Sequence, residues 1–144
     1  MNRVEVERFF PHPVERVFLR YTDHVGWSDW AGLGRVRLTR EGSPERNGVG
    51  AVRSFSSAPG LREEVVRFDS PSLMEYRVTQ GPVPFDQHHG EVRFAPEGSG
   101  TRVTWRVSFR AWIPGSGWLI ERGLGVLFRR MLASLGRDLD GRRG

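Results

Sequence analysis

The sequence has no cysteine and no long apolar segment, and each absence removes a class of protein. Without cysteine there is no disulfide framework, no thiolate nucleophile and no cysteine-ligated zinc or iron–sulfur site, which favours a reducing compartment. The longest uncharged stretch near the C-terminus, residues 111–120, contains a proline and is far shorter than the roughly 20 apolar residues that span a bilayer. Charges scattered through the first 20 residues exclude the apolar core of a signal peptide. We therefore expect a cytoplasmic protein with no stable membrane insertion.

Lysine is also absent, so all 22 basic residues are arginines. The chain has 144 residues, of which 38% are hydrophobic and 27% charged, close to the averages of soluble folded proteins. This length suits one domain, residues 1–144, with one core. The net charge of +5 is modest, so the positions of the arginines must decide whether it marks a polyanion partner.

The N-terminal third of the chain predicts one strand and two short helices. Residues 2–9 alternate between apolar and charged side chains, which is the period of a half-buried strand. Pro13 then suits the start of a helix, and apolar residues follow it at helical spacing through Tyr21. Residues 22–34 contain Trp27 and Trp30 without a long period, which indicates a second short helix or a turn.

The remainder predicts an antiparallel meander followed by a long helix. Short runs with strand character are separated by Gly, Pro and Ser clusters, and connections this short exclude parallel crossovers. With the first strand this gives about seven strands. From Ile120 to Leu139 the apolar residues fall within an arc of about 140°, as in an amphipathic helix. The opposite side of that helix carries Arg122, Arg129, Arg130 and Arg137.

Several short motifs occur in a characteristic order along the chain. They are Pro13-x-x-x-Val17-Phe18, Trp27-x-x-Trp30, Gly48-Val49-Gly50, Glu64-Val65-Val66-x-Phe68-Asp69-x-Pro71 and Tyr76-Arg77-Val78. In this order the chain resembles the SRPBCC (START/Bet v 1-like) superfamily, and most closely its polyketide cyclase/dehydrase-like branch. The resemblance implies an α+β helix-grip fold, in which a curved antiparallel sheet of about seven strands wraps around a long C-terminal α-helix, with two short helices between strands one and two. It also implies an apolar cavity between sheet and helix that binds a hydrophobic or amphipathic ligand such as a lipid, polyketide or quinone-like molecule, with no cofactor.

Strand alternation predicts which side chains face that cavity, because successive residues point to opposite faces of a sheet. The inward sets converge on an apolar wall with Glu64, Tyr76, Gln80 and His88 as its candidate polar points, and the final helix adds three residues. The predicted ligand-binding residues are Glu64, Val66, Phe68, Met74, Tyr76, Val78, His88, Val92, Phe94, Val103, Trp105, Val107, Leu124, Phe128 and Met131. The alternative is that these side chains fill a core and leave no cavity.

A catalytic cavity is a second hypothesis. A cyclase or dehydratase of the branch that the chain resembles would move protons at a carbon next to a carbonyl. Glu64 would accept the proton, and Tyr76 or His88 would donate to the developing enolate. The sequence does not decide between this enzyme and a binding protein without activity.

Other signals give weaker or negative predictions. His88 and His89 are adjacent strand residues that face opposite sides, so we expect no metal site. The arginines of the predicted sheet are interleaved with carboxylates. No aromatic residues that could stack on bases are interleaved with the arginines on the exposed face of the last helix, so no nucleic-acid partner is expected. The basic helix face, extended by Arg142 and Arg143, remains a third alternative as an interaction surface. A homodimer is a further alternative, because Trp112 and Trp118 are expected to expose apolar surface.

Overall fold

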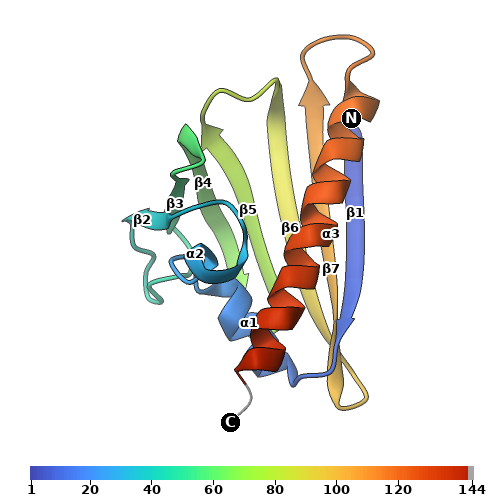
Figure 1. Cartoon of the computed structure of the whole chain (residues 1–144). Coiled ribbons are helices and arrows are strands. Elements are labelled where there is room, and N and C mark those ends of the chain that lie inside the picture. The colour runs from blue at the N-terminus through green and yellow to red at the C-terminus, as the bar shows by residue number, and fades with distance from the viewer. Residues whose placement is uncertain (143–144) are drawn as a thin grey trace.

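A computed structural model, which describes residues 1–142, contains a seven-stranded antiparallel sheet. The strand order is β1-β7-β6-β5-β4-β3-β2, so the first strand pairs with the last and the remainder form a meander (Figure 1). The strands are β1 (Asn2–Phe10), β2 (Val36–Arg40), β3 (Val52–Phe55), β4 (Ala58–Asp69), β5 (Leu73–Gln80), β6 (Phe85–Glu97) and β7 (Gly100–Ala111). The predicted number of strands and their antiparallel pairing are confirmed.

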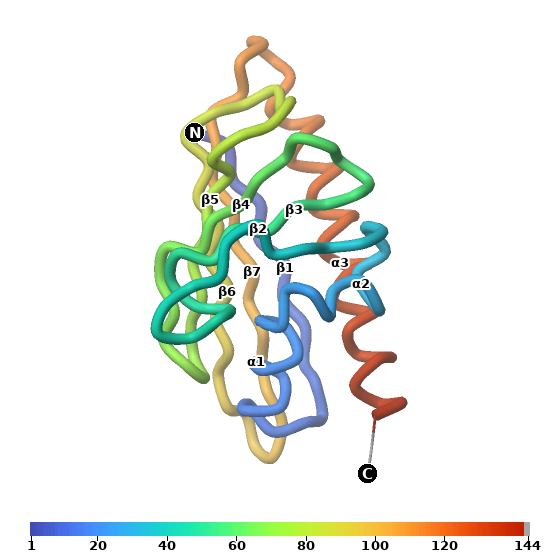
Figure 2. The backbone as a smooth tube through the Cα atoms, turned by 90° about the vertical axis from the view of Figure 1, so that its left-hand side faces the viewer, coloured from blue at the N-terminus to red at the C-terminus, as the bar shows by residue number. Residues whose placement is uncertain are grey.

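Three helices cover one face of this sheet. The short helices α1 (Val14–Thr22) and α2 (Trp27–Trp30) lie between β1 and β2, and α3 (Gly117–Gly141) follows β7. Figure 2 shows all three on the same side of the strands, and Figure 1 shows α3 running along β1 and β7. The predicted helix-grip fold is confirmed. No helix within residues 1–142 is both long and apolar enough to cross a membrane.

The alternation of β7 separates core from solvent as the sequence predicts. Its inward side chains are buried, whereas Arg102, Arg106 and Arg110 lie on the outer face. Each of these arginines contacts a carboxylate on the same face: Glu97, Glu5 and Asp86, respectively. The outer face of the sheet is therefore a mixed, solvated surface, as expected from its interleaved charges.

Helix α1 closes the lower end of the concave face in the view of Figure 1. Its Phe18 is fully buried and meets Phe68 of β4 and Phe94 of β6 edge to face, with ring centroids 5.2 and 5.0 Å apart. Arg20 of α1 donates to Asp138 of α3 at 2.8 Å and ties the two helices together. The core at this end is thus filled by aromatic side chains.

Candidate functional site

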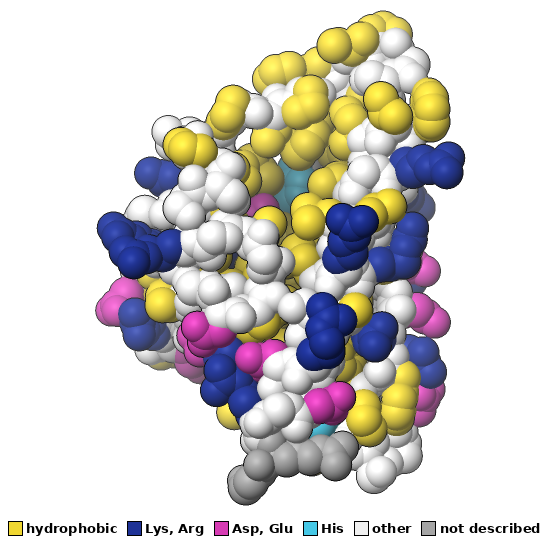
Figure 3. Space-filling model, viewed as in Figure 1, with side chains coloured by type: hydrophobic (Ala, Val, Ile, Leu, Met, Phe, Trp, Pro, Cys, Tyr) yellow, Lys and Arg dark blue, Asp and Glu magenta, His cyan; other side chains and the backbone are white. Residues whose placement is uncertain are grey.

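The upper part of the concave face encloses a cavity of about 250 Å³ between the sheet and α3. Figure 3 shows the opening as a hollow in the molecular surface, with cyan and magenta side chains at its floor. Most of its wall is apolar: Trp27, Leu33, Phe55, Ala58, Leu61, Val78, Val83, Phe85, Trp105, Leu124, Leu127, Phe128 and Met131. The polar lining consists of Arg53, Ser57, Glu63, Tyr76 and His88. This composition, apolar with a few directional groups, is that of a small-molecule site.

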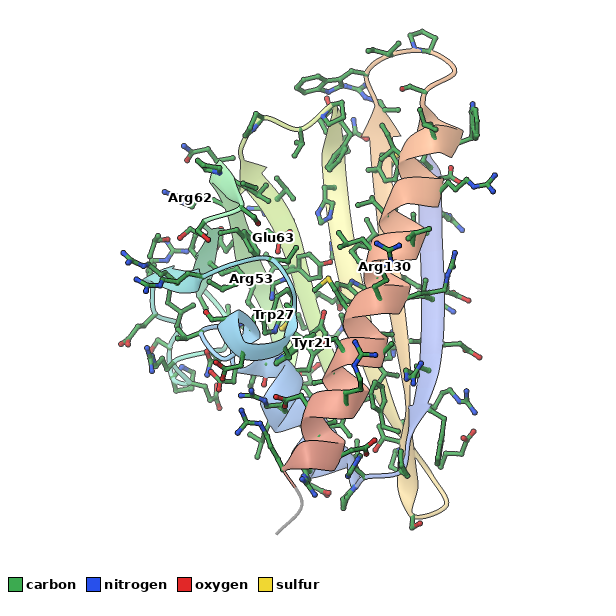
Figure 4. The ribbon with its side chains drawn as sticks, in the orientation of Figure 1. Tyr21, Trp27, Arg53, Arg62, Glu63 and Arg130 are labelled. Carbon is green, nitrogen blue, oxygen red and sulfur yellow. The ribbon has the colours of Figure 1, made fainter. Side chains whose placement is uncertain are left out.

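Arg53 and Glu63 form an ion pair at the floor of the cavity. They are cross-strand partners in the register of β3 and β4, so both side chains project from the concave face (Figure 4). Arg53 Nε donates to Glu63 Oε1 at 2.8 Å, and the two side chains are only 1% and 15% exposed. Burial disfavours the arginine charge, but Glu63 and the nearby tyrosines outweigh it and raise the pKa of Arg53.

The Arg53 guanidinium has further partners on most of its sides. Its Nη1 donates to His24 Nδ1 at 3.2 Å, and its Cζ atom lies 4.1 Å from the ring centroid of Trp27 and 4.7 Å from that of Tyr76. Burial, followed by the charge of Arg53, lowers the pKa of His24 to about 3, so this imidazole is neutral. Its Nε2 then donates to the carbonyl of Asn47, and its Nδ1 is free to accept. Arg53 Nη2, however, is buried without a hydrogen-bond partner among residues 1–142.

Tyr76 is positioned beside this guanidinium by a glycine on the next strand. Gly90 of β6 is its register partner, and a Cβ atom there would lie 2.4 Å from the tyrosine ring. Only glycine therefore lets the ring lie against the strand. Trp105 Nε1 donates to Tyr76 Oη at 2.8 Å, which leaves the phenol hydrogen available to another acceptor. Burial raises the pKa of Tyr76, and the hydroxyl stays protonated at neutral pH.

His88 supplies another donor at the cavity wall. The backbone N–H of Val78 donates to His88 Nδ1 at 3.0 Å. Burial lowers the pKa of His88 against the attraction of Glu63, so the neutral ring carries its proton on Nε2. Within residues 1–142 no three metal-ligating side chains gather into a cluster.

The structure brings only part of the predicted set to the cavity. The predicted residues on its wall are Tyr76, Val78, His88, Trp105, Leu124, Phe128 and Met131. A second group lies on the expected concave face but outside the cavity, packed into the core: Phe68, Met74, Val92, Phe94, Val103 and Val107. Strand alternation gives the face correctly for both groups. It does not reveal that aromatic side chains such as Phe18 fill the lower end.

The prediction that Glu64 and Val66 face the cavity is wrong. The pairing of β4 with β5 shifts between Val65 and Arg67, which marks a β-bulge at Val66. A bulge inserts one residue and reverses the alternation on one side of it. Glu63 and Val65 therefore take the inward places, and Glu64 instead accepts from Arg40 Nη2 at 3.0 Å.

Arg53 and Glu63 line the cavity, and the sequence analysis did not predict either of them there. One signal was available. Arg53 lies between Ala51 and Phe55 at strand spacing, so it shares their apolar face, and an acid follows on the next predicted strand. An arginine in that position requires a buried carboxylate partner.

Comparisons with known proteins agree with this architecture. Residues 1–140 match the model of a family described as polyketide cyclase / dehydrase and lipid transport. A START superfamily protein from Mycobacterium smegmatis has a TM-score of 0.83 at 11% identity, over 99% of this chain and 100% of that one. A protein from Thermus thermophilus has a TM-score of 0.69 at 26% identity, over 97% and 95%. CalU16 from Micromonospora echinospora has 0.73 at 15%, over 99% and 76%, and no curated protein matches the sequence.

Proposed function

The chain belongs to the polyketide cyclase / dehydrase and lipid transport family, and on that premise we propose that its cavity binds a compact, mostly apolar molecule with one polar end. The observation that carries this proposal is Arg53, whose side chain lines a mostly apolar cavity and whose buried Nη2 has no hydrogen-bond partner among residues 1–142. A buried donor without a partner costs about 1 to 3 kcal/mol, which an acceptor on a bound molecule recovers.

The size of the cavity limits the ligand class. Its volume of about 250 Å³ lies at or below the roughly 300 to 1,000 Å³ typical of pockets for drug-sized ligands. A one- or two-ring molecule or a short chain suits this space, whereas a lipid with two long acyl chains is too large to be enclosed.

The polar groups favour a neutral acceptor over an anion. Arg53, Tyr76 and His88 line the cavity, and each carries an N–H or O–H donor. Because the charge of Arg53 is already neutralised by Glu63 at 2.8 Å, a carboxylate ligand would place a second negative charge in the same low-dielectric site. A ketone or quinone carbonyl accepts these hydrogen bonds without that penalty.

Three probes of similar shape test this proposal: menadione, 2-methylnaphthalene and 2-naphthoate. Quenching of tryptophan fluorescence measures their affinity, and the chain has no cysteine to react with the quinone. We expect menadione to bind about tenfold more tightly than the hydrocarbon, which corresponds to one hydrogen bond of about 1.4 kcal/mol. The double variant Arg53→Leu/Glu63→Leu should lose this preference, whereas the exposed control Arg77→Leu should keep it. Equal affinities in the wild type, or a preference that survives the double variant, would contradict the proposal.

A second candidate is proton-transfer chemistry on such a carbonyl compound, and the position of Glu63 favours it. This carboxylate lines the same cavity as Tyr76 and His88, and its charge acts on both of them. With a ketone oxygen held by the donors, Glu63 would take a proton from the adjacent carbon, and the C–H electron pair would form the enolate. Exchange of the α-hydrogens of 2-tetralone with deuterated water, followed by NMR, measures this step. Glu63→Gln should abolish catalysed exchange, and Glu64→Gln, on the other face of β4, should leave it unchanged.

A further inference from the structure

Large apolar side chains are exposed together where β7 passes into α3. Trp112, Ile113, Trp118 and Leu119, which we call the apolar crown, are each between 59% and 64% exposed. Figure 3 shows yellow side chains concentrated at this upper end of the molecule. The other tryptophans, Trp27, Trp30 and Trp105, are buried, so exposure is confined to the two in the crown. An exposed cluster of this kind marks an interaction site.

A cationic strip continues from the crown along the outer side of α3. Arg122, Arg129 and Arg130 are exposed and form no ion pair with any part of the chain from residue 1 to 142. Arg122 follows Trp118 by one helical turn, and Figure 4 shows Arg130 further along the same helix. The contrast with the outer face of the sheet is clear, because Arg93, Arg102 and Arg106 each contact a carboxylate there. The positive charge of the strip is therefore available to an outside partner.

The crown lies at the rim of the cavity. Trp112 lines a small depression together with Val78, Phe85 and His88, which also line the cavity itself. The helix that starts in the crown supplies Leu124 further along to the cavity wall. A surface that covers the crown would thus face the entrance through which an apolar molecule passes.

We propose that the apolar crown and the arginine strip form a docking surface for an anionic lipid bilayer. Tryptophan is the side chain best suited to the membrane interface, where its ring is apolar and its N–H stays hydrated. Each arginine near an anionic membrane contributes about 1 kcal/mol, and the insertion of apolar side chains adds to it. A symmetric dimer through the crown would bring two unpaired arginine strips toward each other, which opposes that alternative. Docking through this surface places the cavity entrance against the bilayer, in which apolar ligands dissolve.

Flotation with vesicles of phosphatidylcholine, with or without phosphatidylglycerol, tests this surface. We expect binding only to the anionic vesicles, weakened by salt, with quenching of tryptophan fluorescence by brominated lipid. Removing three charges in Arg122→Gln/Arg129→Gln/Arg130→Gln should weaken binding on the order of a hundredfold. The matched control Arg93→Gln/Arg102→Gln/Arg106→Gln removes the same charge from the outer sheet and should retain binding. Trp112→Ser/Trp118→Ser should abolish the quenching, with circular dichroism confirming that the variant is folded.

The outcomes that overturn the proposal are equally specific. They are no flotation, flotation that is equal on neutral vesicles, or equal losses in the strip variant and its control. A dimer in sedimentation equilibrium that Trp112→Ser/Trp118→Ser dissociates, with no vesicle binding, would assign the crown to self-association instead. The test involves no cavity ligand, so a variant with a filled cavity, Val78→Phe, should still float. Failure of docking and failure of ligand binding are therefore distinguishable.

Discussion

The two ends of the concave face have the same strand pattern but different contents. At the lower end, α1 places Phe18 between Phe68 and Phe94, and the space is solid. At the upper end the wall, which includes the stacked pair of Trp105 and Phe128, is mostly apolar and encloses a cavity of about 250 Å³. One end is thus a packed core and the other encloses a cavity, although inward-facing strand residues line both.

This difference shows what separates a cavity from a packed core in such a fold. Alternation along a strand determines which face of the sheet a side chain occupies. Whether a cavity remains on that face depends on the helix that packs against it. The cavity is covered by α3 and by Trp27 of α2 and Leu33 after it, and an ion pair occupies its floor. Under the function proposed above, the lower half contributes stability and the upper half leaves space for a ligand. The predictions below test that division, beginning with the largest expected effect.

Shortening a buried side chain at the packed end should reduce the free energy of unfolding the most. Phe18→Ala removes a fully buried ring that contacts two others, and we expect a loss of about 3 to 5 kcal/mol in the free energy of unfolding. Leu127→Ala, on the partly exposed cavity wall, should cost about 1 kcal/mol or less, because little packing is lost there. Urea unfolding followed by circular dichroism measures both. Equal losses would contradict the division into a packed and an open end.

Breaking the ion pair should have the largest effect at the open end. Arg53→Leu leaves Glu63 largely buried without its partner, and we expect a loss of about 3 kcal/mol. The double variant Arg53→Leu/Glu63→Leu removes both charges and should recover most of this stability while losing the polar recognition. Thermal unfolding of the two variants checks the order. A double variant no more stable than the single one would show that the arginine acts through packing on Trp27 and Tyr76.

The fold could be predicted from the sequence because its signals are local and repeated. The alternation in β7 and the apolar stripe of α3 both match the structure, whereas the pairing of β1 with β7 was not predicted. The sequence failed in β4, where the bulge at Val66 exchanges Glu64 for Glu63. A bulge is defined by the pairing with a neighbouring strand, so the sequence of one strand alone does not locate it.

The site was less predictable than the fold for a related reason. Tyr76 and His88 were found because they continue clear apolar alternations, but Arg53 occurs in a short strand between turns and was not assigned a face. Whether Phe94 lines a cavity or fills a core depends on Phe18, which lies more than 70 positions away in the chain. Such a contact is a property of the tertiary structure alone.

Low pH should destabilise the protein through His24, the buried imidazole that accepts a hydrogen bond from Arg53. The pKa of His24 is about 3 in the folded state, against about 6.5 in the unfolded chain, so the unfolded chain binds the proton first as the pH falls. The stability present above pH 6.5 is therefore lost progressively toward pH 3, with a loss on the order of 2 kcal/mol at pH 5. His88, whose pKa is also lowered, acts in the same direction. Urea unfolding between pH 7 and 5 measures the slope, which should be shallower in His24→Asn; an unchanged slope would contradict this assignment.

Filling the cavity should change stability least and binding most. Val78→Phe adds a ring toward existing space, so the free energy of unfolding should change by less than about 1 kcal/mol, because new contacts offset any strain. The same substitution at Val92, on the concave face of β6 but fully packed, should cost about 1 to 3 kcal/mol through overpacking. Menadione binding should be lost in Val78→Phe and retained in any folded Val92→Phe protein. Equal destabilisation by the two substitutions would mean that the upper end is packed as tightly as the lower, and the cavity could not then be a binding site.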